Sequence, residues 1–346
     1  MTRLLFRADG GHPIGTGHLF RVARVIRALA TLTSFEAHIV TADDPVVDKI
    51  IEDPQITVHR LQPRTDLDDL KPQFLAASIL SLLGSLSFDI VAIDMLDTRE
   101  EEMRRVAARG VPLVTFDDRG AGRHFASKLI NILVEEPEAA SLPRSVQLIE
   151  GGNYVVLDPI FAEEHDRPHE RDFGTIRNAF VAMGGADAAG LTLKVAKALK
   201  QVRGLERVEL VAGPAFPHLN ELEDILEKAP WQWQLARGYP SLIPPFLACD
   251  LAIVAGGLTM YEVCCLGTPS LAVCQPIDHQ LELSDRLSAL VAMDTVGWGL
   301  DATEEQIAGA VKALSDDPER RRRMSDIGPT IVDGRVAARV AQALLD

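Results

Sequence analysis

Residues 4–30 of this 346-residue chain are LLFRADGGHPIGTGHLFRVARVIRALA, a short apolar run followed by a glycine-rich loop and a longer amphipathic segment. A short apolar run bounded by glycine is typical of a buried strand, and apolar residues at every third or fourth position indicate a helix. The helix is expected over residues 18–30. Its arginines are expected mostly to face water, namely Arg21, Arg24 and Arg27. The stretch therefore predicts a strand, a loop and a helix in succession.

The same pattern returns at residues 179–199, AFVAMGGADAAGLTLKVAKAL, and short apolar runs alternate with helical segments along most of the chain. This alternation is typical of repeated strand-helix-strand units, so the predicted fold class is α/β with parallel sheets. Strands are expected at residues 4–7, 37–41, 89–94, 113–117, 129–134, 179–183, 208–212, 251–254 and 270–274.

A chain of 346 residues corresponds to two domains, since a domain has about 150 residues. The charged, proline-containing stretch at residues 163–172 is the expected linker, which places an N-terminal domain at 1–165 and a C-terminal domain at 175–346. We leave open whether the last helix returns to the N-terminal domain. Ligands of parallel sheets bind at the carboxyl ends of the strands, so a binding cleft is expected between the two halves.

The chain has 50 acidic and 35 basic residues, a formal charge of −15 that would repel the phosphates of a nucleic acid. No apolar run is long enough to span a membrane and the first residues lack a signal-peptide pattern, so a cytoplasmic protein is expected. Four cysteines lack a metal-binding spacing and are expected to be reduced, buried thiols, namely Cys249, Cys264, Cys265 and Cys274. No cofactor and no metal is predicted, and the oligomeric state is left open, a monomer included.

The glycine loop from Asp9 to His18 lies between a strand and a helix, where parallel-sheet proteins bind ligands. Its glycines would let the backbone approach a bound group closely. His18 falls in the first helical turn, where the helix dipole disfavours the imidazolium, and a neutral imidazole suits a general base. The alternatives are that His18 caps the helix, and that Asp9 either orients the imidazole or caps the loop.

Three common nucleotide or hydrolase motifs are missing from the chain. In Gly15-Thr16-Gly17-His18-Leu19-Phe20, a phenylalanine stands where a dinucleotide-binding fingerprint has its third glycine. The chain has neither the P-loop pattern Gly-x-x-x-x-Gly-Lys-Ser/Thr nor the Gly-x-Ser-x-Gly pattern of α/β-hydrolases. NAD binding, P-loop nucleotide hydrolysis and α/β-hydrolase chemistry are therefore not expected.

Two glycine turns in the second half, Gly184-Gly185 and Gly256-Gly257, each fall between a strand and a helix. Paired turns of this kind can hold a diphosphate, because the first amides of a helix are free donors for phosphate oxygens. Thr259 adds a hydroxyl at the start of the second helix, and Glu262 either closes a capping box or accepts ribose hydroxyls. The alternative for both turns is an ordinary strand-to-helix connection.

Three carboxylates follow strands at the edge that would face the cleft: Asp94, Asp117 and Asp118. One or more of them is expected to contact substrate, or else to cap the next helix. No histidine and acidic cluster has the ligand spacing of a divalent metal site.

Several segments, in this order, resemble one family: the Asp9 loop with Gly15-Thr16-Gly17-His18 and Arg21, Phe116-Asp117-Asp118, Met183-Gly184-Gly185-Ala186-Asp187, and Gly256-Gly257-Leu258-Thr259-Met260-Tyr261-Glu262. From Leu4 to about Leu287 the chain is similar to the UDP-sugar hydrolases of pseudaminic acid biosynthesis and their spore-coat polysaccharide relatives. The second half more distantly resembles the N-acetylglucosaminyltransferase that makes lipid II. Both resemblances imply a GT-B architecture, with two Rossmann-like domains whose parallel sheets face a central cleft.

The resemblance also implies roles for individual residues. It makes His18 the catalytic base, and we expect Asp9 or Asp94 to orient it. The residues implied at the nucleotide are Gly257, Leu258, Thr259, Glu262 and Gly185, with Glu262 on the ribose. Those implied at the substrate are Gly15, Gly17, Arg21, Asp187, His279 and Gln280, with His279-Gln280 in the place of the family's Asn-Gln or Gln-Gln pair.

The implied reaction is the inverting hydrolysis of a UDP-activated, di-N-acetylated deoxy amino sugar to the free sugar and UDP, in nonulosonic acid or surface polysaccharide biosynthesis. UDP leaves readily, so such a hydrolysis needs mainly a base that aims water at the anomeric carbon. The alternatives are a glycosyltransferase in which His18 deprotonates an acceptor hydroxyl, and a non-catalytic protein that binds nucleotide sugars. Two positions depart from the family pattern: no tyrosine follows Asp94 in Met95-Leu96-Asp97, and Asp158 replaces an arginine.

Overall fold

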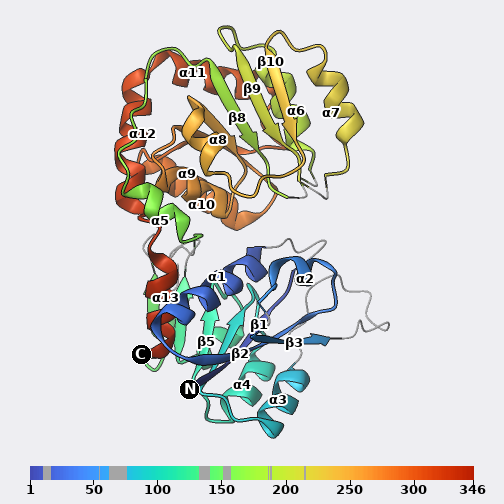
Figure 1. Cartoon of the computed structure of the whole chain (residues 1–346), viewed down its shortest axis with the longest axis vertical. Coiled ribbons are helices and arrows are strands. Elements are labelled where there is room, and N and C mark those ends of the chain that lie inside the picture. Colours follow the sequence, from blue (N-terminus) through green and yellow to red (C-terminus); the bar gives the residue numbers. More distant parts are fainter. Residues whose placement is uncertain are drawn as a thin grey trace. The chain divides into compact units, whose positions relative to one another are not determined.

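The computed structural model describes residues 1–10, 17–53, 55–61, 76–131, 141–150, 157–185, 187, 189–213 and 216–346. The chain divides into two compact units (Figure 1). The first unit consists of Met1–Asp158 and Arg335–Asp346, and the second of Pro159–Gly334. Each unit is built on its own parallel sheet.

The described part of the first unit contains a seven-stranded sheet in the order β3-β2-β1-β4-β5-β6-β7. Its strands are β1 (Thr2–Ala8), β2 (Phe35–Ala42), β3 (Ile56–Leu61), β4 (Ile90–Asp94), β5 (Leu113–Phe116), β6 (Lys128–Asn131) and β7 (Gln147–Glu150). The strand order reverses between β1 and β4, which pair in parallel. Open α/β sheets bind ligands outside the carboxyl ends of such a strand pair, so this edge is where a site is expected.

The first unit also contains helices from both ends of the chain. They are α1 (Gly17–Leu32), α2 (Val46–Ile50), α3 (Ala76–Ser85), α4 (Glu100–Ala107), a 3₁₀ helix (Ala121–Phe125) and α13 (Val336–Leu345). α1 is amphipathic, with Leu19, Val22 and Ile26 on its buried side. α13 packs against α1, and the Nζ of Lys128 on β6 donates to the backbone oxygen of Ala343 at 2.7 Å. The end of the chain is thus part of the first unit.

The described part of the second unit contains a six-stranded sheet in the order β10-β9-β8-β11-β12-β13. Its strands are β8 (Asn178–Ala182), β9 (Arg207–Val211), β10 (Gln232–Ala236), β11 (Leu251–Val254), β12 (Ser270–Cys274) and β13 (Asp294–Trp298). The order reverses between β8 and β11, which pair in parallel with Ala182 opposite Val254. The two glycine turns that follow these strands therefore begin at neighbouring points of one sheet edge.

Helices connect the strands of the second unit and bury an aliphatic core. They are α5 (Ile160–His165), α6 (Leu191–Leu199), α7 (Leu219–Leu226), α8 (Ile243–Ala248), α9 (Leu258–Cys265), α10 (Asp278–Ala289), α11 (Glu304–Asp316) and α12 (Pro318–Ile331). The core includes Val181, Leu210 and Ile253, one from each of three adjacent strands, and all three are fully buried. The predicted α/β class with parallel sheets is confirmed in both units.

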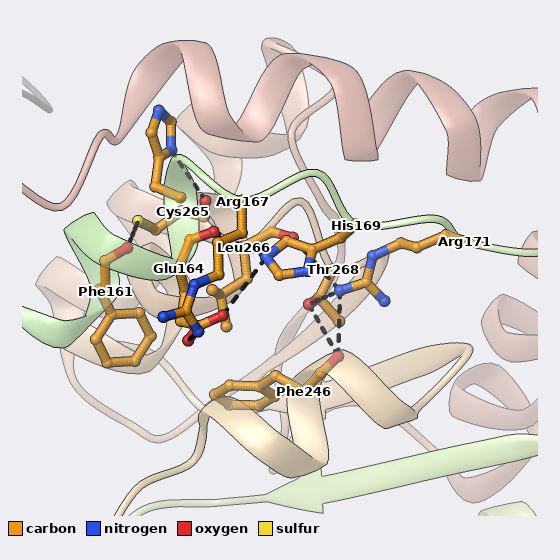
Figure 2. Close-up of polar contacts among 10 residues, drawn as sticks. Phe161, Glu164, Arg167, His169, Arg171, Phe246, Cys265, Leu266 and Thr268 are labelled. Atoms are coloured by element: carbon orange, nitrogen blue, oxygen red, sulfur yellow. Dashed lines mark hydrogen bonds and ion pairs between the residues drawn. The ribbon is translucent and has the colours of Figure 1, made fainter.

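The segment expected to be the linker begins with a helix that is bound to the second unit, as Figure 2 shows. In α5, the Nδ1 of His165 lies 3.3 Å from the backbone oxygen of Cys265. The Sγ of Cys265 lies 3.7 Å from the backbone oxygen of Phe161. The boundary between the units therefore falls between Asp158 and Pro159, ahead of residues 163–172.

Arg171, near the end of the same segment, attaches it to the connections around α8 and α9 (Figure 2). Its Nη2 donates to the Oγ1 of Thr268 at 2.7 Å and to the backbone oxygen of Phe246 at 3.3 Å. Burial lowers the pKa of this guanidinium. A polar, proline-containing sequence has thus become a bound arm, because its charged side chains find backbone acceptors on the second unit.

Two further sequence expectations concern single features of the chain. The four cysteines are buried and form no disulfide, as predicted, and burial raises the pKa of Cys249 to about 12. Across the described ranges, no helix combines the length and the apolar character needed to cross a membrane.

Candidate functional site

Four acidic residues gather at the carboxyl ends of three strands of the first unit. Asp9 follows β1, Asp94 ends β4, and Asp117 and Asp118 follow β5. Each is at most 4% exposed. α1 begins at Gly17 after the glycine loop, whose residues 11–16, the predicted substrate residue Gly15 among them, lie outside the described residues. The expected edge of carboxylates is therefore present, and the first turn of α1 supplies its partners.

His18 and Asp94 form a hydrogen-bonded pair at this edge. The Nδ1 of His18 lies 2.6 Å from the Oδ1 of Asp94. An ionised carboxylate can only accept hydrogen bonds, so Nδ1 carries the proton and the Nε2 of a neutral ring is left as an acceptor. The His18 side chain is 17% exposed and that of Asp94 is 1% exposed. A buried carboxylate thus holds a solvent-accessible imidazole in the tautomer that a general base requires.

Arg21 is buried, so the prediction that the arginines of this helix mostly face water is wrong for this one. Its Nε donates to the Oδ2 of Asp94 at 2.6 Å, and its other two nitrogens donate to Asp94 and Asp117. Burial alone would raise the pKa of Asp94, but Arg21 and His18 outweigh burial and lower it to about 2. Burial alone would likewise lower the pKa of Arg21, whereas the two carboxylates raise it. Arg21 thus keeps Asp94 ionised and in place.

Asp9 has a different partner from the one that sequence analysis offered. The two terminal nitrogens of Arg7 donate to its Oδ1 and Oδ2 at 2.5 and 2.6 Å, and the Ala42 amide donates to Oδ1 at 2.8 Å. Arg7 is 1% exposed and Asp9 4%, so this is a buried ion pair that joins β1 to the end of β2. Among the described residues, Asp94 is the carboxylate that orients His18, and Asp9 anchors the start of the glycine loop.

Asp118 ties together the loops that follow β4 and β5. Its carboxylate accepts hydrogen bonds from the Oγ1 of Thr98 at 2.5 Å, from the Thr98 amide at 3.0 Å and from the Gly120 amide at 2.9 Å. Burial raises the pKa of Asp118 to about 6, although these hydrogen bonds and Arg123 act in the opposite direction. Of the two roles left open for Asp118, the structure supports loop capping.

This raised pKa predicts a pH-dependent contribution to stability. The ordinary value is 3.8 and the folded value about 6, so the contribution of Asp118 is full below the first value and is lost as the pH rises through the second. Asp118→Asn keeps an oxygen for both amides and removes the charge. Relative to wild type, its free energy of unfolding should rise by about 2 to 3 kcal/mol between about pH 4 and pH 7, measured by urea denaturation. A difference that does not change with pH would contradict the prediction.

The glycine turns of the second unit lie at neighbouring strand ends, as their predicted pairing requires. Gly184-Gly185 follow β8 and Gly256-Gly257 follow β11. Gly257 is the N-cap of α9, with a φ of 90° that side chains rarely adopt. α9 begins at Leu258, so the amides of Leu258 and Thr259 are at the helix N-terminus, where phosphate oxygens bind favourably.

Glu262 lies in the second turn of α9 and is 8% exposed. Because Gly257 occupies the N-cap position, Thr259 is not placed to form a capping box with Glu262. That alternative is therefore excluded, and ribose binding by Glu262 stays a prediction. The same applies to Gly185, which has open space where a Cβ would lie.

Two residues predicted at the substrate instead contact the protein itself. Asp187 accepts the amides of Leu191 and Thr192 at 2.9 and 2.7 Å, and so caps α6. Gln280, which is 8% exposed, accepts the Gly256 amide at 3.0 Å. Its neighbour His279, in the first turn of α10, is partly exposed. The structure thus separates the two members of the predicted His279-Gln280 pair.

Three buried residues that organise these edges were not predicted: Arg7, Thr98 and Gln275. Arg7 had a signal, since it is a lone charge at the end of an apolar strand and lies two residues before Asp9. Gln275 also had one, because it directly follows β12, as Asp94 and Asp117 mark the ends of β4 and β5. Thr98 has no comparable pattern around it.

Other parts of the described structure lack such features. A cavity of about 190 Å³ in the second unit is lined by residues that include Arg171, Asp250 and Pro269. Asp250 and Pro269 precede β11 and β12, so this cavity lies at the amino ends of the strands, away from the glycine turns. Within the described ranges, no three histidine, cysteine or acidic side chains are grouped to hold a metal ion.

The chain is similar to several proteins, although no family model matches it. It is 25% identical over 349 residues to the spore coat polysaccharide biosynthesis protein SpsG of Bacillus subtilis strain 168, which covers 98% of this chain and 96% of that protein. It is 21% identical over 224 residues to a UDP-2,4-diacetamido-2,4,6-trideoxy-beta-L-altropyranose hydrolase of Campylobacter jejuni, covering 64% of this chain and 73% of that protein. The predicted similarity to spore-coat proteins is confirmed along nearly the whole chain, and the similarity to the hydrolase is shorter.

Solved structures share the fold. Superposition on MurG of Acinetobacter baumannii gives a TM-score of 0.73 at 14% identity, covering 100% of this chain and 99% of that one. The UDP-GlcNAc 2-epimerase of Neisseria meningitidis, solved with UDP-GlcNAc, gives a TM-score of 0.65 at 15% identity, covering 99% of this chain and 100% of that one. The predicted GT-B fold with two Rossmann-like units is thereby confirmed.

Proposed function

We propose that this protein is an enzyme of polysaccharide biosynthesis that hydrolyses a UDP-activated amino sugar with inversion at the anomeric carbon. The observation that carries the proposal is the His18–Asp94 pair, 2.6 Å apart at the carboxyl edge of the first sheet. A neutral imidazole whose Nδ1–H is bonded to a buried carboxylate can take a proton from water through Nε2. The pair is therefore suited to activate a nucleophile.

In this proposal the second unit binds the leaving group. The amides of Leu258 and Thr259 at the start of α9 receive the diphosphate, and Glu262 accepts the ribose hydroxyls. Water attacks the anomeric carbon as the bond from that carbon to the diphosphate oxygen breaks, and His18 takes the proton from the water. The negative charge that develops on UDP is stabilised by the N-terminus of α9. The products are UDP and a free sugar of opposite anomeric configuration.

The names of the relatives support the class of substrate. The Bacillus subtilis relative is named for spore coat polysaccharide biosynthesis, and the Campylobacter jejuni relative for hydrolysis of a UDP-activated diacetamido trideoxy sugar. A di-N-acetylated deoxy amino sugar is therefore the donor that we propose.

Glycosyl transfer is the second candidate, and it has its own support. A stretch of 103 residues, 29% of this chain, is 35% identical to the UDP-N-acetylglucosamine-N-acetylmuramyl-(pentapeptide) pyrophosphoryl-undecaprenol N-acetylglucosamine transferase of Sorangium cellulosum, of which it covers 25%. In a transferase, His18 would take its proton from an acceptor hydroxyl instead of water. Binding of the donor would then be unproductive until an acceptor is present.

A direct test is phosphorus NMR of the purified protein with a panel of UDP-activated amino sugars and no acceptor. Hydrolysis predicts that UDP is released from one donor, and proton NMR of the fresh product should show the inverted anomer. The same sugars carried on other nucleoside diphosphates are the control for the base. Donor binding without release of UDP would contradict hydrolysis and favour transfer.

A further inference from the structure

We infer that Gln275 and Gln280 form a buried amide clamp that holds the two glycine turns of the second unit in position for the nucleotide. The inference rests on the proposed nucleotide binding by these turns. In this role both glutamines are positioning residues, and Gln280 acts on the backbone of its own unit rather than on the sugar.

Gln280 controls the turn that precedes α9. Its Oε1 accepts two hydrogen bonds, from the amides of Gly256 and Gln275, each at 3.0 Å. The side chain also lies so close to Gly256 that an added Cβ would be 2.3 to 2.5 Å from three of its carbons. Glycine at position 256 is therefore required while Gln280 keeps this position. Gly256 and Gly257 lead directly into α9, so Gln280 fixes where that helix begins.

Gln275 extends the same contacts to the other turn. Its Nε2 donates to the backbone oxygen of Met183 at 3.2 Å and to the Oδ1 of Asp187 at 2.7 Å. Met183 immediately precedes Gly184-Gly185, and Asp187 caps α6. Gln275 and Asp187 are 9% and 5% exposed, so both ends of this bond are shielded from water.

The hydrogen bonds form one continuous path. It runs from Gly256 through the side chain of Gln280 to the Gln275 backbone, and from the side chain of Gln275 to Met183 and Asp187. These residues follow β8, β11 and β12, which are adjacent strands. Losing either amide leaves buried backbone or carboxylate groups without a partner, so the turns would shift to regain one.

The chemistry of the two amides predicts opposite responses to the same substitution. Gln280 serves these backbone amides as an acceptor, so a glutamate can replace it in this role and a methionine cannot. Gln275 serves as a donor to a carbonyl and a carboxylate. A glutamate at position 275 has no proton to donate and would repel Asp187, so it should be worse than a methionine.

The test is the affinity of the full chain for UDP, measured by titration calorimetry. Gln280→Met should weaken binding about tenfold or more, and Gln280→Glu should retain more affinity than Gln280→Met. The order should reverse at position 275, with Gln275→Glu weaker than Gln275→Met. Gln306→Met is the matched control, because Gln306 is an exposed amide that caps α11 in the same unit. It should bind UDP like wild type.

Two outcomes would overturn the clamp. If both Gln280 variants bind UDP like wild type and lose only turnover, Gln280 contacts the sugar and the inference is wrong. If wild type itself binds no UDP, the proposed function fails, and hydrogen exchange still decides on the clamp. The Gly256 and Gln275 amides should exchange faster in Gln280→Met than in wild type and Gln280→Glu, and unchanged exchange would overturn the inference.

Discussion

Replacing His18 by asparagine should lower the turnover of the UDP-sugar substrate by about a hundredfold or more and leave the affinity for UDP nearly unchanged. The asparagine side chain is shorter and has no basic nitrogen at the position of Nε2, so the water would lose its proton acceptor. The nucleotide contacts of the second unit are untouched by this change. Released UDP at saturating donor gives the turnover, and titration calorimetry gives the affinity.

A matched variant on the same helix makes this result interpretable. Arg27 lies nine residues further along α1 and its side chain is 54% exposed, so Arg27→Gln should turn over like wild type. Asp94→Asn should fail with His18 in place, because an asparagine amide that donates to Nδ1 would move the proton to Nε2. Wild-type turnover in His18→Asn would show that His18 is not the base.

Removing the carboxylate of Asp9 should lower the free energy of unfolding by about 3 to 5 kcal/mol, because Asp9→Leu leaves the guanidinium of Arg7 buried without its countercharge. Arg7 and Asp9 are 1% and 4% exposed, so water cannot replace the lost partner. Urea denaturation of the variant and of wild type measures the difference.

The double variant Arg7→Met/Asp9→Leu distinguishes a buried ion pair from a catalytic carboxylate. It removes both charges and should recover most of the lost stability, with a remaining cost of about 1 kcal/mol for the Ala42 amide that Asp9 had accepted. A double variant no more stable than Asp9→Leu would contradict the assignment of Asp9 to structure.

Central strands of both sheets could be predicted from the sequence, whereas edge strands could not. β4 and β12 are buried at every residue, so they appear as continuous apolar runs. The four strands that were not predicted are β3, β7, β10 and β13, which are the edges of the two sheets. No residue of β3 or β13 is fully buried. Their sequences carry little hydrophobic signal because their stability comes from hydrogen bonds to one neighbouring strand.

The candidate residues of the first unit show the same division. Sequence position placed Asp9, His18 and Asp94 near one sheet edge, because they follow or precede elements that meet there. It could not decide which carboxylate orients His18, since both alternatives have the same charge and stand at strand ends. Arg7 decides the matter by occupying Asp9, and Arg21 by joining Asp94.

The sequence alone determined the α/β class, the two repeated units and the glycine turns, because these depend on local periodicity and on backbone freedom that only glycine has. Tertiary structure alone decided which polar side chains are paired. Arg21 turned inward, Gln280 turned to the Gly256 backbone, and Asp187 became a helix cap. A buried polar group takes whatever partner the fold brings within hydrogen-bond distance, and that partner comes from strands far apart in the chain.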